Sequence, residues 1–203
     1  MSKQFSRYGI LFVVSAPSGA GKSTLCDALR QTPDFVYSVS CTTRTPRAGE
    51  IEGEDYHFLS EAEFAARATA GEFLEYANVH GKYYGSLREP IVGDLQKGVD
   101  VLIDIDTQGA AAIRAYDDAF IRQALADVFI MPPDLEELSR RLTKRGTETP
   151  EQIEVRLRTA AREMELWRDY RYTIISRSVE EDLLKFRHIM GAERYLSTRM
   201  ILA

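Results

Sequence analysis

The stretch Ser15 to Thr24, S-A-P-S-G-A-G-K-S-T, constrains the fold more than any other part of this 203-residue chain. It follows the apolar run Ile10 to Val14, which predicts a strand covered on both faces. A helical segment from Lys22 to Arg30 comes next, and Thr32-Pro33 ends it. Strand, glycine-containing loop and helix, in this order, form the context in which G-x-x-x-x-G-K-[ST] binds phosphate. The segment therefore predicts a site for a nucleotide triphosphate.

Each part of the predicted loop has a physical reason. Gly19 and Gly21 can adopt backbone angles closed to other residues, so successive N–H groups can point at a phosphate. The helix N-terminus adds partial positive charge, Lys22 can reach the β- and γ-phosphates, and the Ser23 hydroxyl is the expected Mg²⁺ ligand. Ala16 replaces the first glycine of the motif and needs only room for one methyl group. The predicted ATP-binding residues are Ala16, Pro17, Ser18, Gly19, Ala20, Gly21, Lys22, Ser23 and Thr24.

Further apolar runs predict the rest of the core. They lie at Val99 to Ile105, Val128 to Met131 and Tyr172 to Ile175, with helical stretches between them. Strands that alternate with helices indicate an α/β fold with a parallel sheet flanked by helices. At 44% hydrophobic residues, the chain can bury a core as one domain, or as one domain that carries insertions.

Two segments depart from this alternation. From Ser38 to about Glu89, short runs rich in Tyr, Phe, Thr and Gly predict a small β-rich insertion, with one helix near Ser60 to Ala70. Ser60 and Glu63 have the spacing of a capping box. A second insertion is expected at about residues 134 to 165, where Thr149-Pro150-x-Gln152 opens a helix. Its apolar stripe predicts packing against a core, with Arg156 on the other face; the stripe comprises Ile153, Leu157, Ala160, Met164 and Trp167.

Composition excludes several classes of protein. The apolar runs are far shorter than the ~18 residues of a membrane span, and residues 1 to 9 lack a signal-peptide pattern. We therefore expect a cytoplasmic protein with no membrane partner. A net charge of −5 argues against nucleic-acid binding, although local arginines can still attract small anions.

The cysteines and histidines show no pattern of a metal site or a disulfide framework. Cys26 and Cys41 have no metal-ligand spacing and are expected to be reduced, inert thiols. His57, His80 and His188 share no spacing either, so we expect structural or solvent-exposed roles for them.

The first insertion carries candidate groups for a phosphorylated acceptor. Arg44 and Arg47 flank a proline, and a pair of guanidinium groups suits a monophosphate, although two such arginines also describe a solvated surface. Tyr56, Tyr84 and Glu75 in the same segment favour a binding site. Guanine presents N1–H and N2–H₂ as adjacent donors, and the carboxylate of Glu75 could accept both.

Six motifs, in order and over nearly the whole chain, resemble bacterial guanylate kinases, which are nucleoside monophosphate kinases. They are S-C-T-T-R-T-P-R-A-G-E, D-Y-H-F, E-F-L-E-Y-A, Y-Y-G-S, D-I-D-T-Q-G and R-R-L-T-K-R-G-T-E-T. The resemblance implies a P-loop NTPase-type core at residues 1–37, 90–133 and 166–203, a GMP-binding subdomain at 38–89 and a mobile helical lid at 134–165. It implies Mg²⁺-dependent transfer of the γ-phosphoryl group of ATP to GMP, and to dGMP, with ADP and GDP as products. Bacterial members of the family can also carry alanine at the Ala16 position.

The same resemblance assigns roles to individual residues. The positions that match GMP-binding residues are Ser40, Arg44, Arg47, Tyr56, Glu75, Tyr84, Ser86, Asp104 and Asp106. The two aspartates match an acidic pair near Mg²⁺, with Ser23 as metal ligand and Asp104 acting through water. The residues expected to neutralise the transferred phosphate are Lys22, Arg44, Arg141, Arg145 and Arg156. One departure is Ser176-Arg177-Ser178, where the family usually reads N-D-D near adenine, so the resemblance does not predict how adenine is held.

Two other functions stay open at this stage. A non-catalytic guanylate-kinase-like module could use the acceptor pocket to bind phosphorylated proteins, but Lys22 and Ser23 argue against that interpretation. A kinase of the same fold could act on a sugar phosphate, but Glu75 and Ser86 favour a guanine base. The oligomeric state stays open, and a homo-oligomer is compatible with the sequence.

Overall fold

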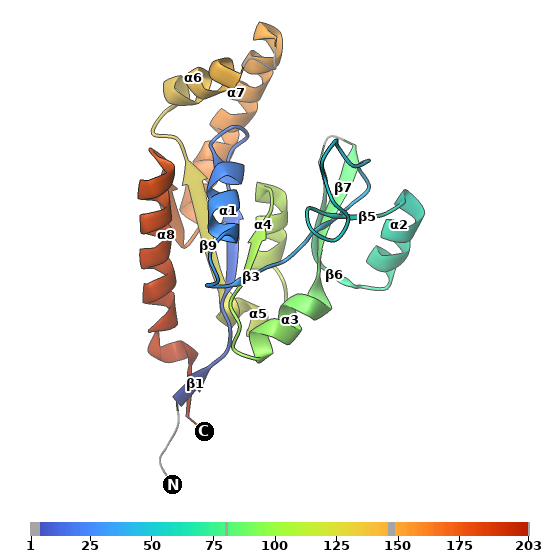
Figure 1. Cartoon of the computed structure of the whole chain (residues 1–203), viewed down its shortest axis with the longest axis vertical. Helices are drawn as coiled ribbons and strands as arrows, with labels where there is room; N and C mark the ends of the chain where they lie inside the picture. Colours follow the sequence, from blue (N-terminus) through green and yellow to red (C-terminus); the bar gives the residue numbers. More distant parts are fainter. Residues whose placement is uncertain (1–4, 80, 146–148, 203) are drawn as a thin grey trace.

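The computed structural model describes residues 5–79, 81–145 and 149–202, except for the side chain of Arg145 (Figure 1). A five-stranded sheet has the order β10-β9-β2-β8-β3, and every neighbouring pair in it is parallel. The strands are β2 (Leu11–Ser15), β3 (Val36–Tyr37), β8 (Val101–Asp104), β9 (Leu125–Met131) and β10 (Tyr172–Ile175). The predicted α/β fold with a parallel sheet is therefore confirmed.

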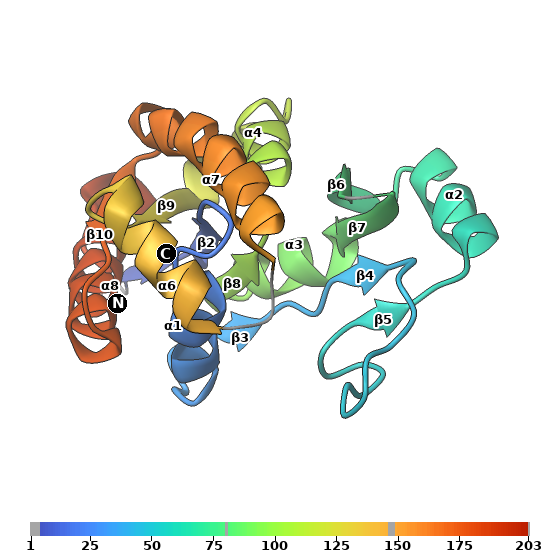
Figure 2. The same cartoon turned by 90° about the horizontal axis from the view of Figure 1, so that it is seen from above.

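Helices cover both faces of this sheet, which explains the uninterrupted apolar run in β2. Alternate residues of a strand point to opposite faces. Phe12 packs in one buried cluster with residues of helices α1 and α8, whereas Leu11 packs in another with residues of α3, α4 and α5. Figure 2 shows α1 and α4 on opposite sides of β2. These helices are α1 (Lys22–Arg30), α3 (Arg88–Gln96), α4 (Thr107–Arg114), α5 (Ala119–Ala124) and α8 (Val179–Arg194).

The first insertion forms a second, four-stranded sheet beside the core, as Figure 2 shows, and its predicted β-rich character is confirmed. Its order is β5-β4-β7-β6, and Cys41, Phe64 and Phe73 form its buried cluster. The predicted capping box is present at the start of α2, since Ser60 and Glu63 each accept from the other's backbone N–H. The elements are β4 (Cys41–Thr42), β5 (His57–Phe58), α2 (Glu61–Thr69), β6 (Phe73–Val79) and β7 (Lys82–Leu87).

The second insertion is a pair of helices, α6 (Leu135–Arg145) and α7 (Pro150–Met164), at one end of the molecule (Figure 1). The Thr149 capping box is present, and part of the predicted apolar stripe packs against α6: Ile153, Leu157 and Ala160 against Leu138 and Leu142. The prediction for Trp167 is wrong. The α-helix ends at Met164 and continues as the 3₁₀ helix η1 (Glu165–Asp169), whose tighter turn carries Trp167 off the stripe, where it is 39% exposed.

The first and last strands of the described chain pair with each other, at the lower end of the molecule in Figure 1. Strand β1 (Phe5–Arg7) pairs antiparallel with β11 (Met200–Leu202), which follows the 3₁₀ helix η2 (Ser197–Arg199). Within the described residues, no helix has the length and apolar character needed to cross a membrane.

One buried carboxylate joins β1 and α8 to the core sheet. Asp100, which is 3% exposed, accepts two hydrogen bonds from Arg7, at 2.6 and 3.0 Å. It also accepts from Arg194 Nε at 2.7 Å and from the backbone N–H of Ile10 at 3.0 Å. The start of β8 is thereby joined to β1, to α8 and to the residue before β2.

Replacing Asp100 with alanine should destabilise the fold strongly. It leaves two arginines and a buried N–H without their carboxylate, which costs about 3–5 kcal/mol. Urea unfolding measures the change. The matched control is Asp117→Ala, because Asp117 is fully exposed in its ion pair with Arg122 and its removal should leave the unfolding midpoint unchanged. Equal midpoints for the two variants would contradict the anchoring role of Asp100.

Candidate active site

The loop between β2 and α1 uses its two glycines as the sequence predicts. Gly19 has φ +87° and Gly21 has φ +103°, both in the left-handed region that favours glycine. Space also matters at Gly19, because a Cβ there would lie 2.7 Å from Leu142 of α6. Ala16, by contrast, is buried and its methyl group belongs to the core cluster on the α1 face. The loop therefore accommodates alanine at the first position of the motif.

Lys22 and Asp104 form an ion pair at the carboxyl edge of the core sheet. Lys22 is the first residue of α1, and Asp104 is the last residue of the adjacent parallel strand β8. Lys22 also donates to the carbonyl of Ile105 at 3.2 Å. Burial opposes the charged amine, but the Asp104 carboxylate outweighs it, so the pKa of Lys22 is raised. Lys22 is therefore positively charged at the end of the loop.

Asp106 has a structural contact of its own. It is the N-cap of α4, and its carboxylate accepts from the backbone N–H of Gly109 at 2.9 Å and from Gln108 Nε2 at 3.2 Å. Of the predicted acidic pair, Asp104 therefore faces Lys22, whereas Asp106 caps a helix.

A polar cavity of about 150 Å³ brings together residues far apart in the sequence. Ser23 of α1 and Asp104 of β8 line it together with Ser40 and Tyr56 of the first insertion. The predicted metal ligands Ser23 and Asp104 thus share one cavity with two predicted GMP-binding residues of the insertion. The remaining lining residues are Asp27, Arg30, Tyr37 and Asp55.

Arg44 is held by a carboxylate that sequence reasoning missed. Its two terminal nitrogens donate to the two oxygens of Glu50, at 2.8 and 3.0 Å, and Glu50 also accepts from the backbone N–H of Arg47 at 2.7 Å. The hydrogen bonds to Glu50 raise the pKa of Arg44. Glu50 lies inside the quoted R-A-G-E motif, but spacing alone does not indicate that the chain turns back on Arg44. The Arg44 guanidinium lies 5.4 Å from the ring centre of Tyr56, which in turn lies 6.0 Å from that of Tyr84.

Glu75 and Ser86 form a buried pair on neighbouring strands. They are register partners in β6 and β7, and Ser86 Oγ donates to Glu75 Oε1 at 2.7 Å. Burial raises the pKa of Glu75 from an ordinary value of 4.5 to about 7, although the Ser86 hydrogen bond partly offsets it. The neutral acid is thus the form that stabilises the fold, and this contribution declines as the pH rises from about 4.5 to about 7.

Arg141 of α6 contacts the loop between β2 and α1. It donates to the carbonyl of Ala20 at 2.9 Å and to the hydroxyl and carbonyl of Ser176 at 3.1 and 3.0 Å. Helix α7 also contacts the loop, since Glu163 accepts from the backbone N–H of Ser18 at 3.1 Å. A cavity of about 400 Å³ opens here, and its lining residues include Thr24, Arg141, Ser176, Arg177, Ser178 and Asp182. The segment that departs from the family pattern therefore lines this cavity.

The predicted arginines lie in separate places. Arg47 is exposed, Arg156 is half-buried on α7, and the side chain of Arg145, the last residue of α6, lies outside the described part of the structure. Figure 1 shows the first insertion and the α6–α7 pair on different sides of α1. The structure thus groups Arg44 with the tyrosines and Arg141 with the loop.

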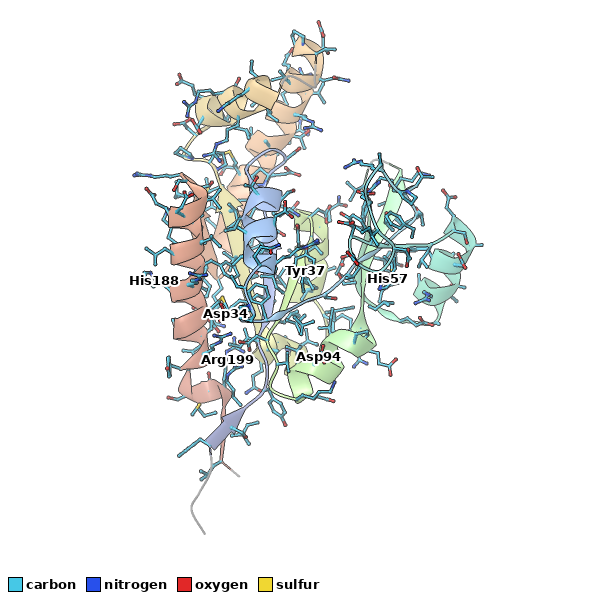
Figure 3. All side chains as sticks on the ribbon, viewed as in Figure 1. Asp34, Tyr37, His57, Asp94, His188 and Arg199 are labelled. Atoms are coloured by element: carbon cyan, nitrogen blue, oxygen red, sulfur yellow. The ribbon has the colours of Figure 1, made fainter. Side chains whose placement is uncertain are left out.

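Both cysteines are buried free thiols, and two of the three histidines lie in the described part of the chain. Burial raises the pKa of Cys41 to about 11 and that of Cys26 well above its ordinary value, which favours the protonated thiol in both. His57 contacts Glu52 at 3.1 Å and His188 is exposed on α8, far from it in Figure 3. His80 lies outside the described residues. No three metal-ligating side chains cluster anywhere in the described ranges.

Comparisons with known proteins agree with this geometry. A family model described as guanylate kinase matches residues 8–193. A guanylate kinase of Maricaulis maris is 46% identical over 191 residues, which cover 93% of this chain and 85% of the relative. One of Clostridium perfringens is 42% identical over 189 residues, with coverage of 92% and 84%. The chain belongs to the guanylate kinase family.

A solved guanylate kinase supports this membership at the level of the fold. The crystal structure of guanylate kinase from Anaplasma phagocytophilum aligns with a TM-score of 0.80 at 34% sequence identity, covering 98% of this chain and 93% of that chain. The family predicted from the six motifs is thus confirmed.

The raised pKa of Glu75 predicts a pH-dependent affinity for GMP. If the ionised carboxylate accepts from guanine, the dissociation constant should fall about tenfold between about pH 6 and about pH 8, as the ionised fraction rises. Isothermal titration calorimetry measures it. The GMP phosphate also titrates, with a pKa of about 6, so Glu75→Gln is the control that keeps only that contribution. Identical pH profiles for the two proteins would contradict the role of Glu75.

Proposed function

We propose that the chain is an ATP:GMP phosphotransferase that transfers the γ-phosphoryl group of ATP to GMP and releases ADP and GDP. The observation that carries the proposal is the shared cavity, because it joins Ser23 and Asp104 of the core to Ser40 and Tyr56 of the first insertion. A donor phosphate on the loop and an acceptor phosphate in the insertion can meet only at such a junction.

The donor is assigned to the loop. Backbone N–H groups between Ala16 and Thr24, together with the N-terminus of α1, suit the phosphates of ATP. The charge of Lys22 suits the β- and γ-phosphates. Arg141 donates to Ala20 of the loop and to Ser176, which supports a role for its guanidinium in binding the same phosphates.

The acceptor is assigned to the first insertion. Arg44 and Arg47, with the hydroxyls of Ser40, Tyr56 and Tyr84, suit the phosphate of GMP. Glu75 and Ser86 suit the base. We extend the acceptor to dGMP, because the assigned groups bind the phosphate and the base, which dGMP shares with GMP.

The reaction needs no general base. The nucleophile is a phosphate oxygen of GMP, which is nearly fully ionised at neutral pH because its second pKa is about 6. Catalysis then consists of holding two polyanions in line and neutralising charge on the transferred group. We assign this neutralisation to Lys22, Arg44 and the arginines of the α6–α7 pair, Arg141, Arg145 and Arg156.

Mg²⁺ fits the oxygen donors at the junction. In proteins it often keeps several waters and binds through one or two protein oxygens and substrate phosphates. Ser23 and Asp104 supply such oxygens within one cavity. We assign Ser23 as a direct ligand and Asp104 as a ligand through water; bound Mg²⁺ would neutralise negative charge on the phosphates of ATP.

Water is a competing acceptor, which gives the α6–α7 pair a role as a mobile lid. The residues assigned to ATP lie in the core and the lid, and those assigned to GMP lie in the insertion at 38–89, apart from Asp104 and Asp106 of the core. A cytoplasmic location and self-association stay predictions from the sequence.

Lys22→Ala should abolish turnover and leave GMP binding largely intact. The lysine lies at the loop, and its described hydrogen bonds go to Asp104 and Ile105 of the core rather than to a residue of the first insertion. A coupled assay of ADP release measures turnover, and calorimetry measures GMP affinity. Lys97→Ala is the control, since Lys97 is exposed and, among the described residues, its ammonium pairs with one carboxylate, that of Asp94 in α3. Full activity of Lys22→Ala would remove the loop from the mechanism.

A further inference from the structure

Gly109 lies against the carboxylate that we assign to the base of GMP. It is a buried residue in the first turn of α4, and its backbone N–H donates to Asp106. A Cβ added at Gly109 would lie 2.6 Å from Glu75 Oε2 and 3.2 Å from Glu75 Cδ. Real Cβ atoms do not approach another atom this closely, so any side chain at this position must displace the carboxylate.

Backbone conformation does not explain the glycine. Gly109 is helical, unlike Gly19 and Gly21, whose φ angles are positive. Alanine is a better helix former than glycine, so helix stability alone would favour alanine at this position. The closest contact of an added side chain is with Glu75, so space for this carboxylate is a reason for glycine here.

The Glu75 carboxylate has one defined orientation, which a new methyl group at position 109 would change. Its Oε1 atom is held by Ser86 Oγ at 2.7 Å, and the residue is only 6% exposed. Its Oε2 atom faces Gly109. Ser86 on one side and the bare Cα of Gly109 on the other therefore set the orientation of the carboxylate.

We propose that Gly109 is a specificity-determining residue, because its missing side chain lets Glu75 present both oxygens to the two adjacent donors of guanine. This inference rests on the proposed assignment of Glu75 to the acceptor base. Gly109 acts as a positioning residue, since it works through Glu75.

The atoms around Gly109 distinguish a role in positioning Glu75 from a role in holding the fold together. The atoms nearest to the added Cβ belong to side chains: the end of Glu75, and Ile105 Cδ1 at 3.3 Å. The side-chain end can rotate without moving the backbone of α4. A methyl group at position 109 should therefore displace the carboxylate and leave the fold intact.

Gly109→Ala should raise the dissociation constant for GMP about 10- to 100-fold, the equivalent of losing one or two hydrogen bonds. Its thermal midpoint should match that of the wild type. The matched control is Gly93→Ala in α3, because a Cβ at Gly93 has no described atom within 4 Å, so GMP affinity should not change. Calorimetry and thermal denaturation measure the two quantities.

A double-mutant cycle with Glu75→Ala tests the route of the effect. In that background Gly109→Ala should change the dissociation constant for GMP less than about twofold. An equal loss in both backgrounds, an unchanged affinity of Gly109→Ala, or a lowered thermal midpoint in that variant would overturn the inference. Failure of the proposed function is a separate result, since the wild type would then not phosphorylate GMP at all.

Discussion

The parallel pairing of β2 with β8 is the constraint on which the site depends. Parallel strands end at the same edge of a sheet, so the loop after β2 and the carboxylate at the end of β8 become neighbours. The ion pair between Lys22 and Asp104 forms there. The loop assigned to the donor starts at this edge of the sheet. The cavity beside it is lined by residues of the core and of the first insertion.

Carboxylates set the position or charge of several groups assigned to the site. Asp104 raises the pKa of Lys22, Glu50 grips Arg44 with both oxygens, and Glu137 accepts from Arg141 Nε at 2.7 Å. A long cationic side chain loses conformational freedom when it binds a phosphate. Holding it beforehand in one geometry lowers that cost, which is the physical advantage of such partners.

Local features could be predicted from the sequence, and contacts between distant segments could not. The helix Lys22–Arg30, the strand Tyr172–Ile175 and both capping boxes depend on neighbouring residues, and all are present. The prediction for Trp167 is wrong because the spacing of apolar residues does not indicate the change from α-helical to 3₁₀ geometry.

In the candidate site, too, the sequence indicated single residues but not the contacts between distant segments. The motifs indicated Lys22, Glu75 and Asp104, and the structure adds how they are surrounded. Neither the grip of Glu50 on Arg44 nor the contact of Gly109 with Glu75 follows from residue spacing, because each depends on how separate segments turn and pack. The side chain assignments of the site as a whole stay predictions.

The central claim is that the loop binds the phosphoryl donor, whereas the insertion selects GMP as the acceptor by binding its guanine base. The most direct measurement is ADP release from ATP and Mg²⁺ with GMP, dGMP, AMP, CMP and UMP offered one at a time. We predict turnover with GMP and dGMP, and at least about 100-fold lower kcat/KM with the other three, because a buried carboxylate left unpaired penalises them. Turnover that is fastest with AMP would contradict the account.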